Sequence, residues 1–391
     1  MRVGVDATGW LNRRGSGRVV RSLVPRLVGL EPRDHYALFI DEASLPAADL
    51  PAGAAVRAVR LRRSPAAAIS QARSRRPADV LRLARAVRTE ALDVFLAPAV
   101  DTWFPVRGLP VVLGVHDATA AELPRLVLPD ARSRALWRLK QRHALRSASL
   151  MFTPSLSARD AIAARLHVPE ERLRVIRWAA DPVFAPPERE AVTAAAGRLG
   201  LGPDEPYLVY AAGINPHKGL GTLLEAVAAL DPRPRLVVAG ALEGDYVSAA
   251  DELRGRIAGL ELADHVVLAG FLPDHELAAL YGGALAAVVP SLAEGFGLPA
   301  VEAAACGAAT VLSDIGPHRE TLGEHALLFP PGDAAALRAQ LERVAADGAL
   351  RQRLAQEGRA AVAALSWDAA ADAIRELLVE AVERHPPPRG G

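Results

Sequence analysis

Short apolar runs alternate with helical patterns along almost the whole chain, and this alternation constrains the fold more than any other feature. The runs are continuous in apolar residues, which is typical of strands buried on both faces of a parallel sheet. In the first half they fall at 3–6, 36–41, 56–61, 93–97, 111–116, 150–153 and 173–178. In the second half they fall at 207–211, 235–239, 266–269, 286–289, 309–313 and 327–329. The helical patterns between them lie at 17–30, 79–91, 130–146, 156–166, 220–230, 247–260, 275–281, 299–306, 334–347 and 350–365. The sequence therefore predicts an α/β fold with two Rossmann-like, doubly wound parallel sheets.

The Pro-rich segment 181–187 is poor in strand-forming residues and predicts the junction between the two halves. A length of 391 residues also suits two domains. We expect an N-terminal domain over 1–182 and a second domain over 183–366. A final amphipathic helix over 367–385 and a disordered tail over 386–391 complete the prediction. Doubly wound sheets bind ligands outside the carboxyl ends of their strands, so we expect two facing domains with a cleft between them.

The overall composition excludes several classes of protein. The net charge is only +1, which argues against a protein built chiefly to bind nucleic acid, and 51% hydrophobic residues permit a large core. A single cysteine, Cys306, fits the reducing cytoplasm. Because no signal peptide or membrane-length apolar run is visible, we expect a cytoplasmic location.

Charge is unevenly distributed, because the region 57–88 holds ten arginines and one acid, Asp79. This region predicts either a solvated surface or a patch that faces an anion. In the second case the partner is an anionic acceptor or the anionic lipid at the inner face of the cell membrane, where the protein would bind peripherally.

The segment from Glu294 to Glu302 carries the strongest functional signal. It places Gly295 and Gly297 in a turn that leads through Pro299 into a helix. The free N–H groups of such a turn and the helix dipole both favour negative charge. Carboxylates beside this anion cradle accept hydrogen bonds from hydroxyls. The combination suits a nucleotide sugar, which has phosphates in the middle and a polyol at each end.

A second loop, 213–219, follows the strand 207–211 and contains His217 and Lys218. A lysine at the start of a helix opposes the helix dipole unless an anion lies between them. A diphosphate would resolve that conflict, with His217 as a second donor. The loop does not match a Walker A motif.

Two further candidates lie in the first half. His116 ends a strand and is placed to form a hydrogen bond with a sugar hydroxyl; its alternative is a packed residue at the domain boundary. The turn of Gly15, Gly17 and Arg18 fails as a dinucleotide fingerprint, because Val20 stands where the third glycine is required. It remains either a plain turn or a group of amides that closes over the diphosphate.

Together these motifs resemble the retaining glycosyltransferases of family 4, which have the GT-B architecture. The resemblance extends from residue 1 to about 384. Its most specific part is the pair of glutamates with seven residues between them, Glu294 and Glu302. Supporting matches are His116 with Asp117, the segments 153–157, 216–219 and 313–330, and the glycine turn before Arg18.

The resemblance implies a retaining hexosyltransferase that uses a nucleotide-diphosphate sugar as co-substrate and requires neither a metal nor another cofactor. The acceptor would be a hydroxyl of a glycan, a lipid-linked or a small molecule, and the glycine turn hints at GDP-mannose as the donor. In such enzymes His116, Lys218 and Glu294 would be catalytic, Glu302 would hold the ribose, and the final helix would return to the N-terminal domain. The residues expected to bind the nucleotide sugar are Gly15, Gly17, Arg18, Gly213, His217, Lys218, Leu272, Glu294, Gly295, Phe296, Gly297, Leu298 and Glu302.

The chain departs from the family pattern at the phosphate clamp. Many members have arginine where this chain has Gly213, and a subgroup has arginine where it has His217. Neutralisation of the diphosphate therefore rests on Lys218 together with Arg18 or another group of the first domain. Three alternatives remain at this point: a GT-B epimerase or hydrolase, a non-catalytic nucleotide-sugar-binding protein, and a two-carboxylate glycosidase.

Overall fold

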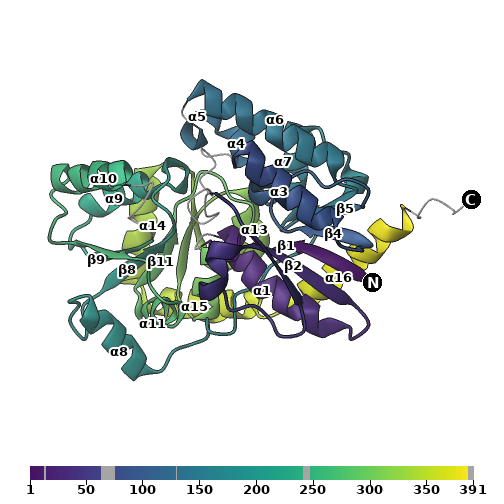
Figure 1. The fold of residues 1–391 in the computed structure, drawn as a ribbon. Helices are drawn as coiled ribbons and strands as arrows, with labels where there is room; N and C mark the ends of the chain where they lie inside the picture. Colours follow the sequence, from purple (N-terminus) through teal and green to yellow (C-terminus); the bar gives the residue numbers. More distant parts are fainter. Residues whose placement is uncertain (13–14, 63–74, 129, 241–246, 386–391) are drawn as a thin grey trace, which may run out of the picture. The chain divides into compact units, whose positions relative to one another are not determined.

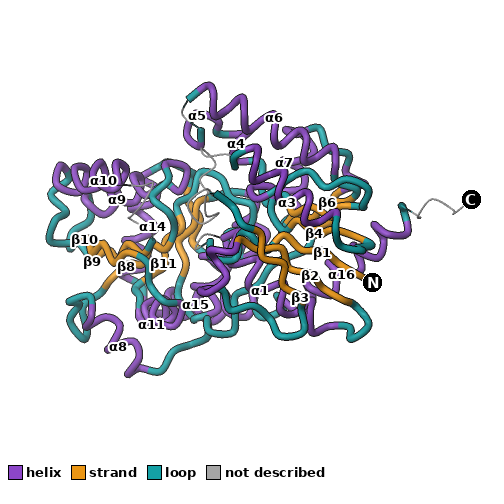
Figure 2. Tube along the Cα trace, viewed as in Figure 1, coloured by secondary structure: helices purple, strands orange, loops and turns teal. Residues whose placement is uncertain are grey.

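The computed structural model describes the chain except residues 13–14, 63–74, 129, 241–246 and 386–391 (Figure 1). The chain divides into two compact units. The first comprises Met1–Trp178 together with Ser366–Gly391, and the second comprises Ala179–Leu365. Strands alternate with helices through both units, as Figure 2 shows.

The first unit contains a seven-stranded sheet whose described pairings are all parallel. Its order is β3-β2-β1-β4-β5-β6-β7. The strands are β1 (Arg2–Asp6), β2 (His35–Asp41), β3 (Ala55–Val59), β4 (Val94–Ala97), β5 (Val111–Gly114), β6 (Leu150–Thr153) and β7 (Leu173–Val175). The order reverses between β1 and β4, which makes this pair the topological switch point of the sheet.

Helices cover both faces of this first sheet. They are α1 (Gly15–Leu30), α3 (Pro77–Arg88), α4 (Thr119–Glu122), α5 (Pro124–Val127), α6 (Ala131–Ser147), α7 (Leu156–Leu166) and α16 (Trp367–Glu383). Helices α3, α6 and α7 share one core with Phe95 and Met151 of the sheet. On the other side α1 packs against α16, which also contacts β4 and β5. Side chains alternate between the faces of a strand, so Phe95 faces the first core and Leu96 the opposite side.

The second unit repeats this design with a six-stranded, all-parallel sheet in the order β10-β9-β8-β11-β12-β13. The strands are β8 (Tyr207–Ala211), β9 (Arg235–Ala239), β10 (Val266–Gly270), β11 (Ala286–Val289), β12 (Thr310–Ser313) and β13 (Leu327–Phe329). The helices are α8 (Arg189–Arg198), α9 (Leu220–Ala228), α10 (Val247–Gly259), α11 (Asp274–Gly283), α12 (Leu298–Ala305), α13 (Gly316–Thr321), α14 (Ala334–Ala346) and α15 (Gly348–Val362). The switch point here lies between β8 and β11.

Two separate cores cover the faces of the second sheet. One unites α9, α10 and α14 with Tyr210 and Val288, and the other unites α8, α11 and α12 with Val209 and Ala287. Short 3-10 turns complete the two units at Glu42–Ala47, Val100–Thr102, Glu170–Arg172, Pro216–Lys218 and Gly323–His325.

The predicted α/β class with two Rossmann-like domains is confirmed by these sheets. The periodicity missed α8, whose buried residues Ala195 and Ala196 are too small to give a clear apolar stripe. None of the helices in the described ranges has both the length and the hydropathy that a bilayer crossing requires.

Candidate functional site

The strand order of the second unit brings two predicted loops together. Because β8 and β11 are neighbours, the loop after β8 and the loop after β11 leave the same edge of the sheet side by side. The first loop carries Lys218 and the second carries Glu294. These residues are separated by 76 positions in the sequence, and the sheet places them in contact.

The two loops also interlock through their backbones. The backbone N–H of Leu292 donates to the carbonyl of His217 at 2.8 Å. Gly219 adopts a left-handed conformation with φ of 72°, and a Cβ there would lie 1.9 Å from the carbonyl oxygen of Pro290. Only glycine fits this close approach. The Lys218 loop is therefore held directly against the Glu294 loop.

Lys218 and Glu294 form an ion pair in which Nζ donates to Oε1 at 2.7 Å. Ser291 donates its hydroxyl to the same oxygen at 2.8 Å. Burial by itself raises the pKa of Glu294, but the charge and hydrogen bond of Lys218, with help from His318 and Ser291, bring that pKa below its ordinary value. The anion expected beside Lys218 at the start of α9 is thus, in the protein alone, the Glu294 carboxylate.

The loop from Glu294 enters α12 through Gly297, which has a left-handed φ of 89° and no side-chain cap. The first N–H groups of α12 lack helical partners by geometry, so the predicted anion cradle has the required backbone form. A Cβ on Gly297 would lie 2.8 Å from Cδ2 and 3.0 Å from Nε2 of His318. The imidazole therefore occupies the space that a side chain at this position would need.

His318 on α13 is a site residue that the motif analysis missed. It is fully buried, and its Nδ1 donates to the carbonyl of Ser313 at 2.8 Å. That bond leaves Nε2 as the lone-pair nitrogen of the neutral ring, and Nε2 has no partner among the described residues. Burial lowers the pKa of His318, while the Glu294 charge opposes that shift. A histidine just inside a helix that begins with Gly-Pro was the available signal.

Ser313 connects this histidine to the Glu294 loop. Its hydroxyl donates to the carbonyl of Ser291 at 2.5 Å, and Ser291 in turn holds Glu294. The end of β12 thereby supports the loop that follows β11. These hydrogen bonds fix the position of the Glu294 carboxylate.

The other predicted residues of this unit lie at varying depth. The carbonyl of Gly213 accepts the Tyr210 hydroxyl at 2.8 Å, which fixes the start of the Lys218 loop. Phe296 and Leu298 are buried, so only their backbones can face a ligand. Leu272 packs against the core beneath α11.

Glu302 lies one helical turn beyond Leu298, about 6 Å along the axis of α12. Its carboxylate is 4% exposed and near the thiol of Cys306, whose pKa is raised to about 12, chiefly by burial and secondarily by Glu302. Cys306 itself is the buried C-cap residue of α12. Glu302 is therefore a buried residue of α12.

The glycine turn of the first unit forms the start of α1, with Gly15, Gly17 and Arg18 in its first turn. A Cβ on Gly17 would lie 1.8 Å from the carbonyl oxygen of Asn12, so glycine is required for that contact. Arg21 holds the same segment by donating to the carbonyls of Trp10 and Asn12 at 2.6 and 2.7 Å. Packing within the first unit is therefore enough to explain the glycine in this turn.

His116 follows β5 and is held on two sides. Its Nε2 donates to the carbonyl of Pro98 at 2.8 Å, and its ring meets Trp178 edge to face at 4.8 Å. Burial lowers the pKa of His116, with Asp101 opposing the shift, so the ring is neutral near pH 7. The remaining ring nitrogen, Nδ1, is then a hydrogen-bond acceptor.

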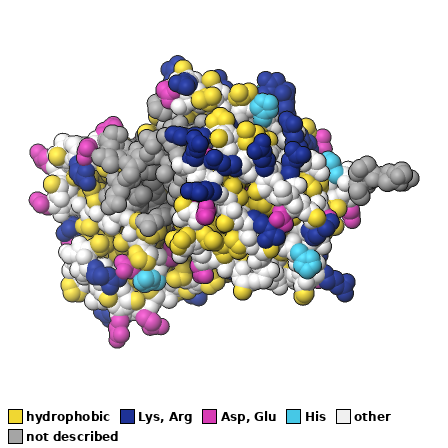
Figure 3. All heavy atoms as spheres, in the orientation of Figure 1, with side chains coloured by type: hydrophobic (Ala, Val, Ile, Leu, Met, Phe, Trp, Pro, Cys, Tyr) yellow, Lys and Arg dark blue, Asp and Glu magenta, His cyan; other side chains and the backbone are white. Residues whose placement is uncertain are grey.

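The basic region 57–88 is described over 57–62 and 75–88, and the rest lies outside the described residues. On the face drawn in Figure 3, Lys and Arg side chains gather around α3. Arg60, Arg62, Arg76, Arg82 and Arg85 line a pocket between β3 and α3. In the part of the chain that the structure describes, no group of three His, Cys, Asp or Glu side chains is arranged to hold a metal ion.

Comparison with known families accounts for most of the chain. Residues 193–361 match the family described as Glycosyl transferases group 1. Residues 13–183 match the family described as Glycosyltransferase Family 4. The two matches fall on the second and first units respectively.

Curated relatives agree with these families. The chain is 30% identical over 290 residues to a D-inositol 3-phosphate glycosyltransferase of Thermobispora bispora, covering 71% of this chain and 66% of that protein. It is 33% identical to the protein of the same name from Xylanimonas cellulosilytica, over 55% of this chain and 53% of the relative. The serotype-specific mannosyltransferase WbdA of Escherichia coli is 31% identical, over 56% and 27%. The chain spans about half the length of the curated relatives it matches.

Solved structures share the fold over nearly the full length. Sucrose-phosphate synthase of Thermosynechococcus elongatus superposes with a TM-score of 0.79 at 21% identity, covering 98% of this chain and 100% of that one. Anabaena HepE in complex with UDP-glucose superposes with a TM-score of 0.76 at 19% identity, over 97% and 99%. These likenesses show the same fold.

Proposed function

This chain belongs to family 4 of the glycosyltransferases, and from that premise we propose that it transfers a hexose from a nucleotide-diphosphate sugar to an acceptor hydroxyl with retention of configuration. The observation that carries this proposal is the Lys218–Glu294 pair at the switch point of the second sheet. A cation, an acid and a helix N-terminus meet there, at the edge where doubly wound sheets bind ligands.

Donor binding would exchange one anion for another at Lys218. A diphosphate carries more negative charge than the single carboxylate that Lys218 now contacts at 2.7 Å. When the phosphates take Lys218 and the first amides of α12, the Glu294 carboxylate is released to accept hydrogen bonds from the sugar hydroxyls. The Lys218–Glu294 pair therefore accounts for the charge balance of the site without a donor and for the way in which a donor would bind.

The proposed reaction breaks the bond between the sugar C1 and the phosphate oxygen, whose electron pair stays with the departing diphosphate. The acceptor oxygen forms the new bond to C1 on the same face, and its proton passes to the departing phosphate. Lys218 and the amides after Gly295 stabilise the charge that develops, and one such preorganised donor is worth about 3 kcal/mol. Glu294 orients the sugar and does not attack it. This arrangement assigns no role to a divalent metal.

The names of the relatives suggest which acceptors to test first. The relatives from Thermobispora and Xylanimonas are named for D-inositol 3-phosphate, so a phosphorylated polyol is the first acceptor class to test. Glycan and lipid-linked hydroxyls are the further classes. WbdA is named a mannosyltransferase, and HepE was crystallised with UDP-glucose, so GDP-mannose and UDP-glucose are the first donors to compare.

A thermal-shift panel of GDP-, UDP-, ADP- and dTDP-sugars tests the donor class. A ligand at 100 times its dissociation constant stabilises the folded state by about 2.7 kcal/mol, which raises the melting temperature measurably. The same panel on Glu294→Ala should retain the response to the nucleotide diphosphate, while transfer to acceptor collapses. Undiminished transfer by Glu294→Ala would refute the assigned role of this carboxylate.

Product analysis then separates transfer from other reactions of the same fold. The donor is incubated with and without acceptor, and with and without a chelator. An epimerase or hydrolase converts the donor alone, whereas the proposed transferase requires the acceptor. Loss of transfer on chelation would contradict the metal-free mechanism.

A further inference from the structure

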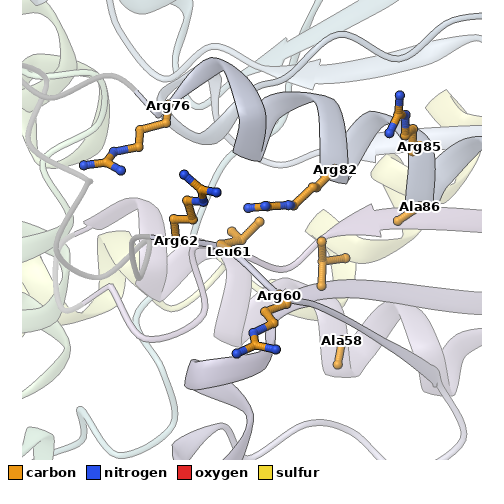
Figure 4. A pocket seen from close by; sticks show the side chains of 9 residues that line it. Ala58, Arg60, Leu61, Arg62, Arg76, Arg82, Arg85 and Ala86 are labelled. Carbon is orange, nitrogen blue, oxygen red and sulfur yellow. The ribbon is translucent and has the colours of Figure 1, made fainter.

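The first unit contains a pocket of about 880 Å³ between the edge strand β3 and helix α3. Five arginines line it, with Arg60 and Arg62 following β3 and Arg76, Arg82 and Arg85 before or on α3. Figure 4 shows Arg62 and Arg82 extending toward one another across the space between the two elements. We call this cavity the arginine pocket.

One acid organises the arginine pocket without neutralising it. Asp79 is 2% exposed, and its Oδ1 accepts both the backbone N–H of Arg62 at 3.0 Å and Nη1 of Arg82 at 2.9 Å. The carboxylate therefore ties the end of β3 to the first turn of α3 and aims one guanidinium into the pocket. Asp79 carries a single negative charge, and Arg82 already forms an ion pair with it.

The other four arginines form no ion pair with any described residue. Elsewhere on the same strand the chain does supply partners, because Arg57 binds Glu90 through both guanidinium nitrogens that face it. Like charges that converge repel one another, and no described acid other than Asp79 forms an ion pair with this group of arginines. Its charge is complementary to an external anion.

The remaining lining is apolar and comes from Ala58, Val59, Leu61 and Ala86. A volume of about 880 Å³ is in the range of small-molecule sites. Guanidinium groups match phosphate oxygens through paired N–H donors, which makes arginine the preferred phosphate ligand among basic residues.

We propose that the arginine pocket binds the phosphate group of a phosphorylated acceptor, with Arg62 and Arg82 as its principal ligands. This inference rests on the proposed function, because the bound molecule is taken to be the substrate that receives the sugar. It adds the place at which the phosphate of that substrate binds and the residues that select it. The phosphate can belong to a soluble polyol or to a lipid headgroup.

Calorimetric titration of the full chain tests the proposal with three probes: inositol 1-phosphate, unphosphorylated inositol and inorganic phosphate. The expected result is binding of the two phosphate compounds and none of inositol. The double variant Arg62→Ala/Arg82→Ala should weaken phosphate binding at least tenfold. The control Arg33→Ala/Arg88→Ala removes the same charge from exposed positions outside the pocket and should leave binding unchanged. Equal losses in both double variants would overturn the proposal.

Vesicle flotation distinguishes the source of the phosphate. Anionic phosphatidylglycerol vesicles are compared with neutral phosphatidylcholine vesicles, using the same two double variants. Binding to anionic vesicles that only the pocket variant loses supports a lipid headgroup; binding to soluble inositol 1-phosphate alone supports a polyol. Absence of binding to every phosphate probe refutes the proposal.

The donor assay keeps this outcome separate from the proposed function. Nucleotide-sugar thermal shifts should be the same in the pocket variant and the wild type, because none of the residues assigned to donor binding lines the arginine pocket. Donor binding without any phosphate binding at the pocket would leave the transferase intact and remove the acceptor site. Loss of the donor response in the wild type would instead remove the transferase itself.

Discussion

The two charged regions of this protein treat positive charge in opposite ways. In the second unit Lys218 has a carboxylate partner at 2.7 Å, on a loop held by Ser291 and Ser313. In the first unit four of the five arginines of the arginine pocket have no ion-pair partner among the described residues. The cation of the second unit is balanced by a neighbouring carboxylate, whereas the described residues leave most of the charge of the arginine pocket unbalanced.

This difference indicates how each region responds to its ligand. In the proposed function a diphosphate at the Lys218 site would displace Glu294, so that binding would rearrange an existing pair and free an acid for the sugar. At the proposed arginine pocket a phosphate would add negative charge beside four arginines that have no ion pair among the described residues, and Arg82 would share it with Asp79. If both proposals hold, the first arrangement would couple donor binding to catalysis, and the second would serve recognition of the acceptor.

The largest expected effect comes from breaking the compensated pair with Lys218→Met. Transfer should fall about 100- to 1,000-fold, since a preorganised cation at the leaving group is lost. Stability should also fall by about 3–5 kcal/mol at pH 7, because a buried charge is left without its partner. Steady-state kinetics and urea unfolding measure the two losses.

The pH dependence of this loss has a definite sign. In the wild type the lowered pKa of Glu294 contributes stability above the ordinary value of 4.5 that is lost as pH falls through the folded pKa. In Lys218→Met the lysine no longer opposes the burial that raises the pKa of Glu294. The stability that the variant has lost relative to the wild type should therefore become smaller as the pH falls from 7 to 5. The double variant Lys218→Met/Glu294→Gln should recover stability at pH 7 but not transfer. If neither acidification nor the added Glu294→Gln substitution reduces the loss of stability in Lys218→Met, the Lys218–Glu294 pairing is contradicted.

Much of the fold could be predicted from the sequence because continuous apolar strands and intervening helices are local patterns. The loops of Lys218 and Glu294 were also visible, since glycine, proline and charge at the start of a helix are local signals. Their contact was not visible. It depends on β8 lying beside β11, and strand order is a property of the whole sheet.

His318 and the arginine pocket were hidden for the same physical reason. His318 is a site residue only because α13 places its ring under Gly297, 21 residues earlier in the chain. The arginine-rich region was visible as composition, but the strand-to-helix tie through Asp79 turns part of it into a pocket. Whether the remaining expected ligands, including Arg18, Leu272 and Glu302, contact a nucleotide sugar stays a prediction.

A second, smaller effect tests whether packing as well as charge closes the Glu294 site. Gly297→Ala forces a side chain into a left-handed conformation and against His318, whereas Gly307→Ala meets only the conformational cost, with nothing within 4 Å. The control should lose about 1–2 kcal/mol, and Gly297→Ala about 1–3 kcal/mol more. Urea unfolding of both variants gives the comparison. Adding His318→Ala should relieve only the Gly297 variant; equal losses at the two glycines would show that the histidine yields freely.

The smallest expected effect tests the arginine pocket. Arg60→Gln removes a pocket arginine without an ion pair, and we expect the free energy of unfolding to stay within about 0.5 kcal/mol of the wild type. Arg57→Gln, on the strand β3 that Arg60 follows, removes a bidentate pair with Glu90, and it should lose up to about 1 kcal/mol. Raising the salt concentration should shrink the second loss, because the pair is partly exposed. If Arg60→Gln instead costs more than Arg57→Gln, the pocket arginines stabilise the fold and need no external anion to explain their grouping.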